Sequence, residues 1–379
     1  MSLDPLNILL FLMIGWVLLY LVSQYLPVEK YNIEVAPLYL TYKTQRLNNF
    51  LQNTASKHPQ FWRVASNIGV VTAVGEIILA IYILGNNLFN FLFVPQQAQA
   101  IFPLLPGITI SLRWFPYLLI AIGLAITVHE ISHGVVASLE KITVKSAGII
   151  LAPITFGGFV EPDEEVFLKS RPLSKLRLLA SGSLANLVFG LIVTLIATSI
   201  FIPNSGILIM NVDEEGAAYS AGIRPWDVLV MINNTQINNL ADLTQVMKDV
   251  QPGDFLIVDT TAETYLLTTI PSPTNTSRGI MGISNLVDYF ALRIGEVSPE
   301  FTYHFNLTLY WISLLMINLA VFNMLPLFPL DGEAYLSSII QEKTQKYHKP
   351  IRYFINGASL SLLASNIALT LVTYGLTPI

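Results

Sequence analysis

The stretch FPYLLIAIGLAITVHEISHGVVASL, residues 115–139, decides the fold of this chain. It is apolar over about 20 residues, the length that a helix needs to cross the hydrocarbon core of a membrane. Three ionisable residues interrupt it, in the pattern His129-Glu130-Ile131-Ser132-His133. Ionisable groups are costly to bury in a membrane and normally mark a functional site there. The stretch therefore predicts a membrane-spanning helix that carries chemistry.

The H-E-x-x-H pattern has the spacing of a zinc site. Residues four apart share one face of a helix, so His129 and His133 can both reach one metal ion. Glu130 is offset by about 100° and can stand beside an attacking water molecule. A lone pattern of this kind also arises by chance, but its position inside an apolar span argues against that alternative.

Composition extends the membrane reading to the whole chain. Of the 379 residues, 53% are hydrophobic and only 12% are charged, and the mean hydropathy is +0.58. A net charge of −5 disfavours nucleic-acid binding, and the absence of cysteine excludes thiolate catalysis and Cys-ligated zinc. Six apolar runs are long enough to span a membrane: residues 7–26, 66–90, 115–139, 178–202, 304–325 and 354–376. The first lacks a basic start and a cleavage site, which favours a retained span over a signal peptide.

Positive charges predict the orientation of these spans. Fifteen of the 20 Lys and Arg residues fall in the loops after the first, third and fifth spans. Cytoplasmic loops carry excess positive charge, so both termini are expected on the exoplasmic side. The expected location is a prokaryotic cell membrane, with an organelle membrane as the alternative.

Residues 203–300 differ from the spans around them. They hold 12 of the 25 acidic residues and short alternating apolar runs. Runs at 206–212, 228–232, 255–260 and 265–270 predict strands, and 240–250 has the spacing of a short helix. We expect a mainly-β domain on the exoplasmic side, where segment 216–237 resembles a PDZ domain that binds extended peptides by strand addition.

A second irregular stretch, VKSAGIILAPITFGGFVEP (144–162), follows the third span. It is apolar but too short to cross, and Pro153, Gly157 and Gly158 break it. Such backbone is tolerated at membrane depth only when it is buried in protein or lines a wet cavity. This pattern predicts a re-entrant β-hairpin.

A catalytic zinc usually has three protein ligands, so a third must come from elsewhere in the chain. Asp331 ends the motif NMLPLFPLDG (323–332), in which two prolines break the helix. Asp331-Gly332 alone could be a turn or a helix cap. Depth favours the metal, because the histidines lie roughly 9 to 15 Å and Asn186 roughly 12 Å inside the cytoplasmic ends of their helices. Asp331 follows the fifth span near the same leaflet.

The ordered set of H-E-x-x-H, GGFVE (157–161), SGSLAN (181–186), a PDZ-like segment and NxxPxxxLDG resembles the site-2 protease family of intramembrane zinc metalloproteases. The resemblance implies one Zn²⁺ per chain with His129, His133 and Asp331 as ligands. It also implies Glu130 as general base and acid, and Asn186 as a residue that holds the substrate backbone or the oxyanion. The GGFVE stretch then lies near the substrate.

The expected fold is a polytopic α-helical membrane protein with about six transmembrane helices, a membrane-embedded β-hairpin region and an inserted PDZ-like domain. Its parts are two N-terminal helices with their loops (1–114), a catalytic membrane core (115–202 and 301–379) and the PDZ-like domain (203–300). The expected substrates are membrane-anchored proteins within the lipid bilayer. One alternative is a catalytically silent PDZ-bearing scaffold, which is disfavoured because a scaffold has no need of the base Glu130. The other is a transporter, which is disfavoured because the sequence lacks two similar halves.

Two further carboxylates need an explanation. Related motifs often run L-D-G-G, whereas Glu333 follows Gly332 in this chain. Glu76 lies in the middle of the second span, where pairing with another residue and a role in water access are both open.

Overall fold

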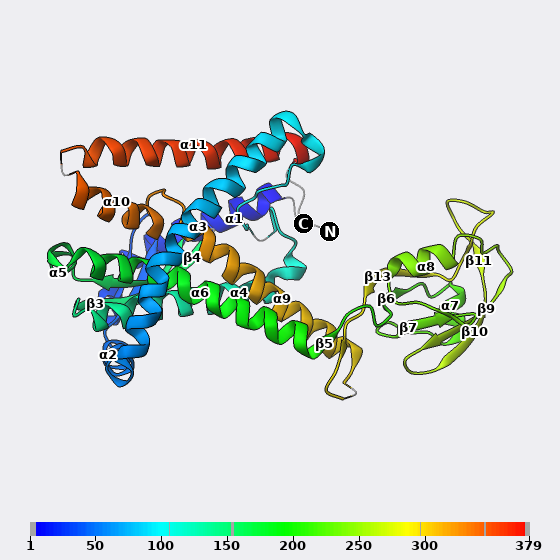
Figure 1. The fold of residues 1–379 in the computed structure, drawn as a ribbon. Coiled ribbons are helices and arrows are strands. Elements are labelled where there is room, and N and C mark those ends of the chain that lie inside the picture. Colours follow the sequence, from blue (N-terminus) through cyan, green and yellow to red (C-terminus); the bar gives the residue numbers. More distant parts are fainter. Residues whose placement is uncertain (1–4, 106, 153–154, 296, 345, 376–379) are drawn as a thin grey trace. The chain divides into compact units, whose positions relative to one another are not determined.

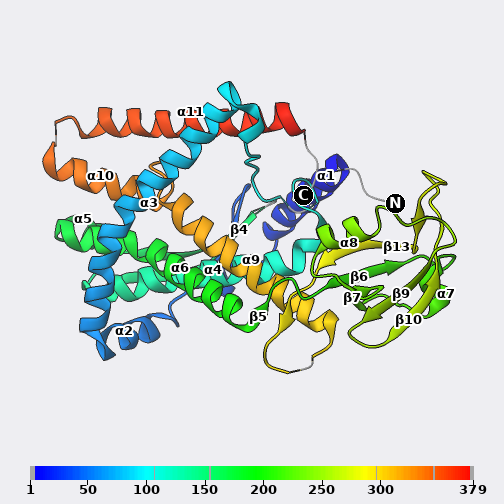
Figure 2. The same ribbon diagram turned by 45° about the vertical axis from the view of Figure 1, so that its right-hand side comes forward.

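The computed structural model describes residues 5–105, 107–152, 155–295, 297–344 and 346–375. The chain divides into two compact units, residues 1–191 with 311–379 and residues 192–310. Figure 1 draws the elements of both units, and Figure 2 draws them from a second direction. Because the two units are not placed relative to one another, each is described by itself.

The first unit is mainly helical. Its helices, two of which continue into the second unit, are α1 (Pro5–Ser23), α2 (Asn48–Lys57), α3 (Pro59–Phe93), α4 (Phe115–Leu139), α5 (Glu164–Lys169), α6 (Pro172–Ile200), α9 (Pro299–Asn323), α10 (Asp331–Lys343) and α11 (His348–Tyr374). Among the residues that the structure describes, five segments are long and apolar enough to cross a membrane: α3, residues 112–139 that include α4, α6, α9 and α11. This confirms a polytopic helical membrane protein, while a crossing by α1 stays a prediction.

Polar side chains tie three of these helices together near the start of α6. The Arg177 Nη1 donates to Glu140 Oε1 over 2.8 Å, and the Arg177 Nε donates to Asn67 Oδ1 over 2.9 Å. Both partners of the Arg177–Glu140 pair are largely buried. A buried, hydrogen-bonded pair of this kind specifies one arrangement of α3, α4 and α6. Further along, α6 and α9 run side by side in both views (Figures 1 and 2).

The first unit also contains a four-stranded antiparallel sheet. Its order is β1 (Ile33–Val35), β2 (Leu40–Thr44), β3 (Val144–Ala152) and β4 (Thr155–Pro162). β3 and β4 pair as the predicted β-hairpin, whose residues 153 and 154 lie outside the described part, while its position inside the membrane stays a prediction. β1 and β2, which the sequence did not predict, pair with the β3 side of the hairpin. This leaves β4 as the edge strand on the other side of the sheet.

Asp163 follows β4 and starts the next element. Its carboxylate accepts a hydrogen bond from the Val166 N–H at the first turn of α5. This bond, together with Lys145, holds the pKa of the Asp163 carboxyl below its usual value. The cap defines where the edge strand ends.

The second unit is a small β domain. Its main sheet has the order β10 (Thr264–Thr268), β9 (Phe255–Thr260), β7 (Val228–Ile232), β6 (Ile207–Val212) and β13 (Ile283–Asp288), with β8 (Thr235–Gln236) also on β7. Two short pairs complete it, β5 (Phe201–Ile202) with β14 (Ala291–Leu292) and β11 (Ile270–Pro271) with β12 (Gly279–Ile280). The strands at 207–212, 228–232 and 255–260 were predicted because alternating apolar residues mark strands with one buried face.

Two short helices, α7 (Ala217–Ala221) and α8 (Leu240–Val246), pack with this sheet. The Asn239 side chain caps α8 by accepting hydrogen bonds from the N–H groups of Ala241 and Asp242. The Leu240 N–H donates to the Asp288 carboxylate over 2.8 Å, which joins the start of α8 to the end of β13. β13 is the last strand in the order of the sheet, so its outer edge is unpaired among the described strands.

Candidate metal centre

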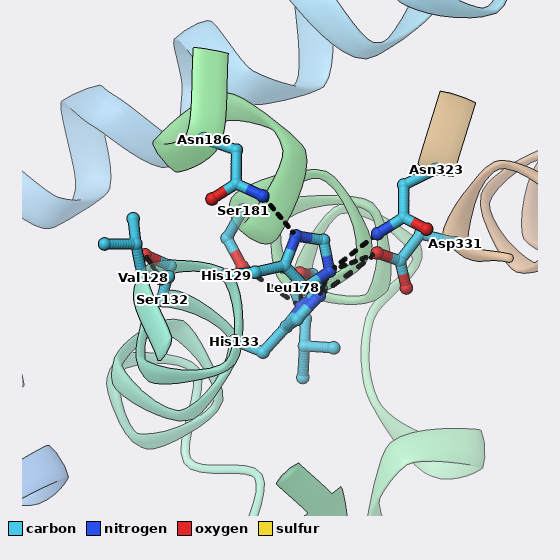
Figure 3. A network of polar contacts seen from close by, with 9 residues as sticks. All are labelled: Val128, His129, Ser132, His133, Leu178, Ser181, Asn186, Asn323 and Asp331. Atoms are coloured by element: carbon cyan, nitrogen blue, oxygen red, sulfur yellow. Dashed lines mark hydrogen bonds and ion pairs between the residues drawn. The ribbon is translucent and has the colours of Figure 1, made fainter. Parts of the chain in front are cut away.

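Helix α4 carries both histidines one turn apart, and both are buried, with 6% and 8% of their surface exposed. Their Nε2 atoms lie 3.0 Å apart. Figure 3 shows the two rings meeting at one point, as the four-residue spacing predicts.

Asp331 reaches the same point from the first turn of α10. Its Oδ2 lies 3.0 Å from the His129 Nε2 and 3.1 Å from the His133 Nε2 (Figure 3). The backbone at Gly332 lies against the backbone at the end of α9. A Cβ at Gly332 would lie only 2.1 Å from the Met324 carbonyl oxygen, so this position requires glycine. Asp331 lies at the start of a helix, but its carboxylate faces the two histidines.

These three atoms suit a metal ion. A triangle with sides of 3.0, 3.0 and 3.1 Å has its corners about 1.8 Å from its centre. One point can therefore lie at the roughly 2.0–2.1 Å that zinc takes from nitrogen and oxygen ligands. His133 Nδ1 lies 2.8 Å from the Leu178 carbonyl oxygen, which only accepts, so the proton of the neutral ring sits on Nδ1. The lone pair on Nε2 then faces other acceptors, an arrangement that a cation stabilises.

The backbone of α6 lies directly against this site. A Cβ at Gly182 would lie 2.5 Å from both the His129 Cε1 and the His133 Nε2. Real side-chain atoms do not approach this closely, so the site leaves room only for a glycine. The sequence motif SGSLAN contained this residue without showing why it is needed.

Two asparagine amides flank the His129 ring (Figure 3). The Asn186 Nδ2 lies 3.5 Å from the His129 Nδ1, and Asn186 is 1% exposed. The Asn323 Nδ2 lies 3.1 Å from the His129 Nε2, and this residue is only partly buried. Asn186 was singled out from the sequence. Asn323 was not, although it begins the NxxPxxxLDG motif.

Glu130 lies beside the edge strand β4. A Cβ at Gly158 would lie 3.0 Å from the Glu130 Cγ and 2.5 Å from the Ile126 Cγ2. The bare backbone of β4 therefore passes next to the carboxylate that follows His129. The structure brings GGFVE and H-E-x-x-H together, although 24 residues lie between His133 and Gly158 in the sequence.

Glu333 turns away from the metal centre. Its carboxylate is 4% exposed and accepts hydrogen bonds from Arg352 and Asn356 on α11. The extra carboxylate in the LDGE sequence is therefore neutralised by its own partners and does not join the Asp331 site.

Glu76 is also buried, at 4% exposed, but its two carboxylate oxygens have no hydrogen-bond partner among the described residues. The described structure thus does not contain the pairing that the sequence left open for Glu76. This carboxylate lies on α3, outside the three-residue cluster of potential metal ligands.

Comparison with known proteins places these residues in a family. Residues 117–365, which contain every residue of the candidate metal centre, match the model of peptidase family M50. The chain is 29% identical over 280 residues to the uncharacterized protein MJ0971 of Methanocaldococcus jannaschii, a match that covers 72% of this chain and 70% of that protein.

Two relatives with functional names match over shorter regions. The membrane-bound transcription factor site-2 protease homolog of Arabidopsis thaliana is 26% identical over 162 residues, which cover 42% of this chain and 32% of that protein. The "Putative zinc metalloprotease slr1821" of Synechocystis is 28% identical over 160 residues, which cover 34% of this chain and 44% of that protein. The chain thus matches less than half the length of these two relatives. The family model spans more than half of the chain, and the protein belongs to peptidase family M50, the site-2 protease family of zinc-dependent membrane metalloproteases.

Proposed function

We propose that this protein hydrolyses peptide bonds within or near the transmembrane segments of membrane-anchored proteins. The observation that carries the proposal is the triangle of His129, His133 and Asp331, which is built on a helix apolar enough to cross a membrane. A metalloprotease needs a metal site, a base and a way to hold an extended substrate. The residues around this triangle can supply all three.

His129, His133 and Asp331 are the proposed zinc ligands. Zinc bound there supplies an electrophile that polarises the scissile carbonyl and makes water more acidic. The Glu130 carboxylate takes a proton from the attacking water and returns it to the leaving amine. The Leu178 carbonyl holds the His133 ring in the tautomer whose Nε2 can bind metal.

The two asparagines receive different proposed roles. Asn186 is almost fully buried, with its Nδ2 beside the His129 Nδ1, so we assign it to orienting that ring. After a 180° flip of the amide, the Asn186 Oδ1, which has no hydrogen-bond partner among the described residues, would accept the Nδ1 proton. The partly buried Asn323 is the better placed amide for donating to the developing oxyanion. This shifts the oxyanion role, expected for Asn186, to Asn323.

The substrate is proposed to add as a strand to the free edge of β4. A transmembrane helix must unwind before hydrolysis because its amides are bonded internally. An extended segment paired with β4 regains those hydrogen bonds. Gly158 places this strand beside Glu130, so the pairing brings a peptide bond to the catalytic carboxylate.

Proline substitutions test this pairing. Successive N–H groups of a strand point to opposite edges, so one of Phe159 and Val160 donates toward β3 and the other toward the free edge. Of the two variants Phe159→Pro and Val160→Pro, we expect one to keep zinc and thermal stability but to lose at least tenfold in cleavage. Wild-type cleavage by both variants would remove strand addition from the mechanism.

We further propose that the domain at 203–300 is PDZ-like and acts as a gate that excludes substrates with large exoplasmic domains. The open edge of β13 and the adjacent α8 support this reading, since a strand edge beside a helix can take an extended peptide. The positive charges of the loops support exoplasmic termini and an exoplasmic position of this domain, in a prokaryotic cell membrane.

Replacing residues 203–300 by a short Gly/Ser linker is expected to raise the cleavage rate of a substrate with a bulky exoplasmic domain severalfold. Cleavage of the same transmembrane segment with a short exoplasmic tail should change little. Loss of cleavage with both substrates would show that the domain serves folding or docking instead of gating.

The proposed function itself is tested by incubating the purified protein with a single-span reporter and determining product masses. We expect a new terminus within or near the span of the reporter. Cleavage confined to soluble segments would contradict intramembrane proteolysis, and absence of cleavage at full zinc loading would favour the scaffold alternative.

A further inference from the structure

Helix α11 holds the carboxylate that follows the Asp331 motif. Arg352 donates to Glu333 from two nitrogens, with Nε 2.5 Å from Oε1 and Nη2 3.0 Å from Oε2. Such a two-pronged pair fixes orientation as well as distance. Glu333 lies on the first turn of α10, two residues after Asp331, so α11 holds the start of that helix.

Asn356, one turn after Arg352 on α11, holds the other side of the same loop. Its Oδ1 accepts a hydrogen bond from the Phe328 N–H over 2.7 Å. Its Nδ2 donates to the Glu333 Oε1 over 3.3 Å and to the Arg352 carbonyl over 2.9 Å. One amide thus joins a backbone group before Asp331 to a side chain after it.

The loop between α9 and α10 needs such support. Pro326 and Pro329 have no N–H groups to donate, so the loop has fewer backbone hydrogen bonds available to hold it. A carboxylate must stay within a few tenths of an ångström of its position to serve a metal together with two fixed imidazoles. Partners beyond the ligands typically contribute 10- to 100-fold in metal affinity.

We propose that Arg352 and Asn356 are positioning residues that hold Asp331 at the metal centre. They act through Glu333 and the Phe328 N–H, and neither contacts Asp331 in the described structure. The proposal rests on the proposed role of Asp331 as a ligand. It makes α11, a helix with no residue in the metal triangle, part of the metal site.

The test compares zinc dissociation constants, measured by competition with a chelator at one pH, for the full-length protein. Asn356→Leu and Arg352→Gln are each expected to raise the dissociation constant at least tenfold. Ser337→Ala is the matched control, because it removes a 2.8 Å contact with His348 between the same two helices, one turn further from Asp331. This control should stay within twofold of wild type.

A double-mutant cycle separates positioning from general folding effects. In the Asp331→Ala background only the two histidines remain as proposed ligands. Adding Asn356→Leu or Arg352→Gln there should not weaken zinc binding further. Equal weakening in both backgrounds would mean that the two residues only support the fold, and would overturn the proposal.

The measurements distinguish failure of the positioning role from failure of the proposed ligand role of Asp331. Wild-type affinity of Asn356→Leu and Arg352→Gln, with a large loss in Asp331→Ala, would overturn the positioning role and leave the proposed function intact. Wild-type affinity of Asp331→Ala would overturn the ligand assignment on which both rest. The visible absorption of the cobalt-loaded proteins gives a second readout, because it reports coordination geometry without catalysis.

Discussion

Replacing Gly182 by alanine is expected to abolish stoichiometric zinc binding. The added methyl group would lie 2.5 Å from atoms of both imidazoles, one of them the His133 Nε2, a proposed zinc ligand. Relief requires α6 to move away or the rings to rotate, and either change breaks the triangle of donor atoms. We expect the zinc dissociation constant to rise more than 100-fold, beyond the 10- to 100-fold effect of partners outside the ligand shell, because the methyl group displaces the donor atoms themselves.

The matched control is Gly123→Ala. Gly123 lies on α4, the helix of the histidines, and a Cβ there has no neighbouring atom within 4 Å. This variant should bind one zinc per chain with wild-type affinity. If Gly182→Ala also binds zinc as tightly as wild type, α6 does not lie against the metal centre in the way described.

Replacing Glu130 by glutamine is expected to lower the cleavage rate by about 10²- to 10⁴-fold while zinc stays bound. The size follows from the usual contribution of a general base, since the amide keeps the shape of the side chain but cannot take a proton. Zinc retention is expected because Glu130 lies outside the triangle of donor atoms. The measurement is the initial rate of reporter cleavage at matched zinc content.

Glu165→Gln controls for the loss of a negative charge. Glu165 is largely exposed on α5, where it pairs with Lys169. Its substitution should leave both zinc content and cleavage within twofold of wild type. An undiminished rate in Glu130→Gln would require a different base.

The candidate metal centre is predictable from the sequence because its main determinants are local. The four-residue spacing puts His129 and His133 on one face of a helix. Burying two imidazoles in an apolar span costs free energy, so such a pair indicates a functional site. Two prolines before Asp331 marked the end of a helix. The depth of Asp331 in the membrane favours it as the third ligand, and its Oδ2 lies about 3 Å from both Nε2 atoms.

What the sequence could not reveal depends on contacts between distant segments. β1 is three residues long and β2 five, and the partner of β2 lies about 100 residues further along the chain. Runs this short carry little periodicity. The partners of Glu333 lie on another helix, and the need for glycine at 182 appears only once α6 packs on α4.

The measurement that tests the central claim most directly is restoration of cleavage by zinc. The purified protein is stripped with a chelator, and zinc is added back while reporter cleavage and bound zinc are measured together. We predict no cleavage by the stripped protein and a return of activity that saturates at one zinc per chain, with Glu130→Gln binding zinc but staying inactive. Undiminished cleavage by the metal-free protein would contradict the account.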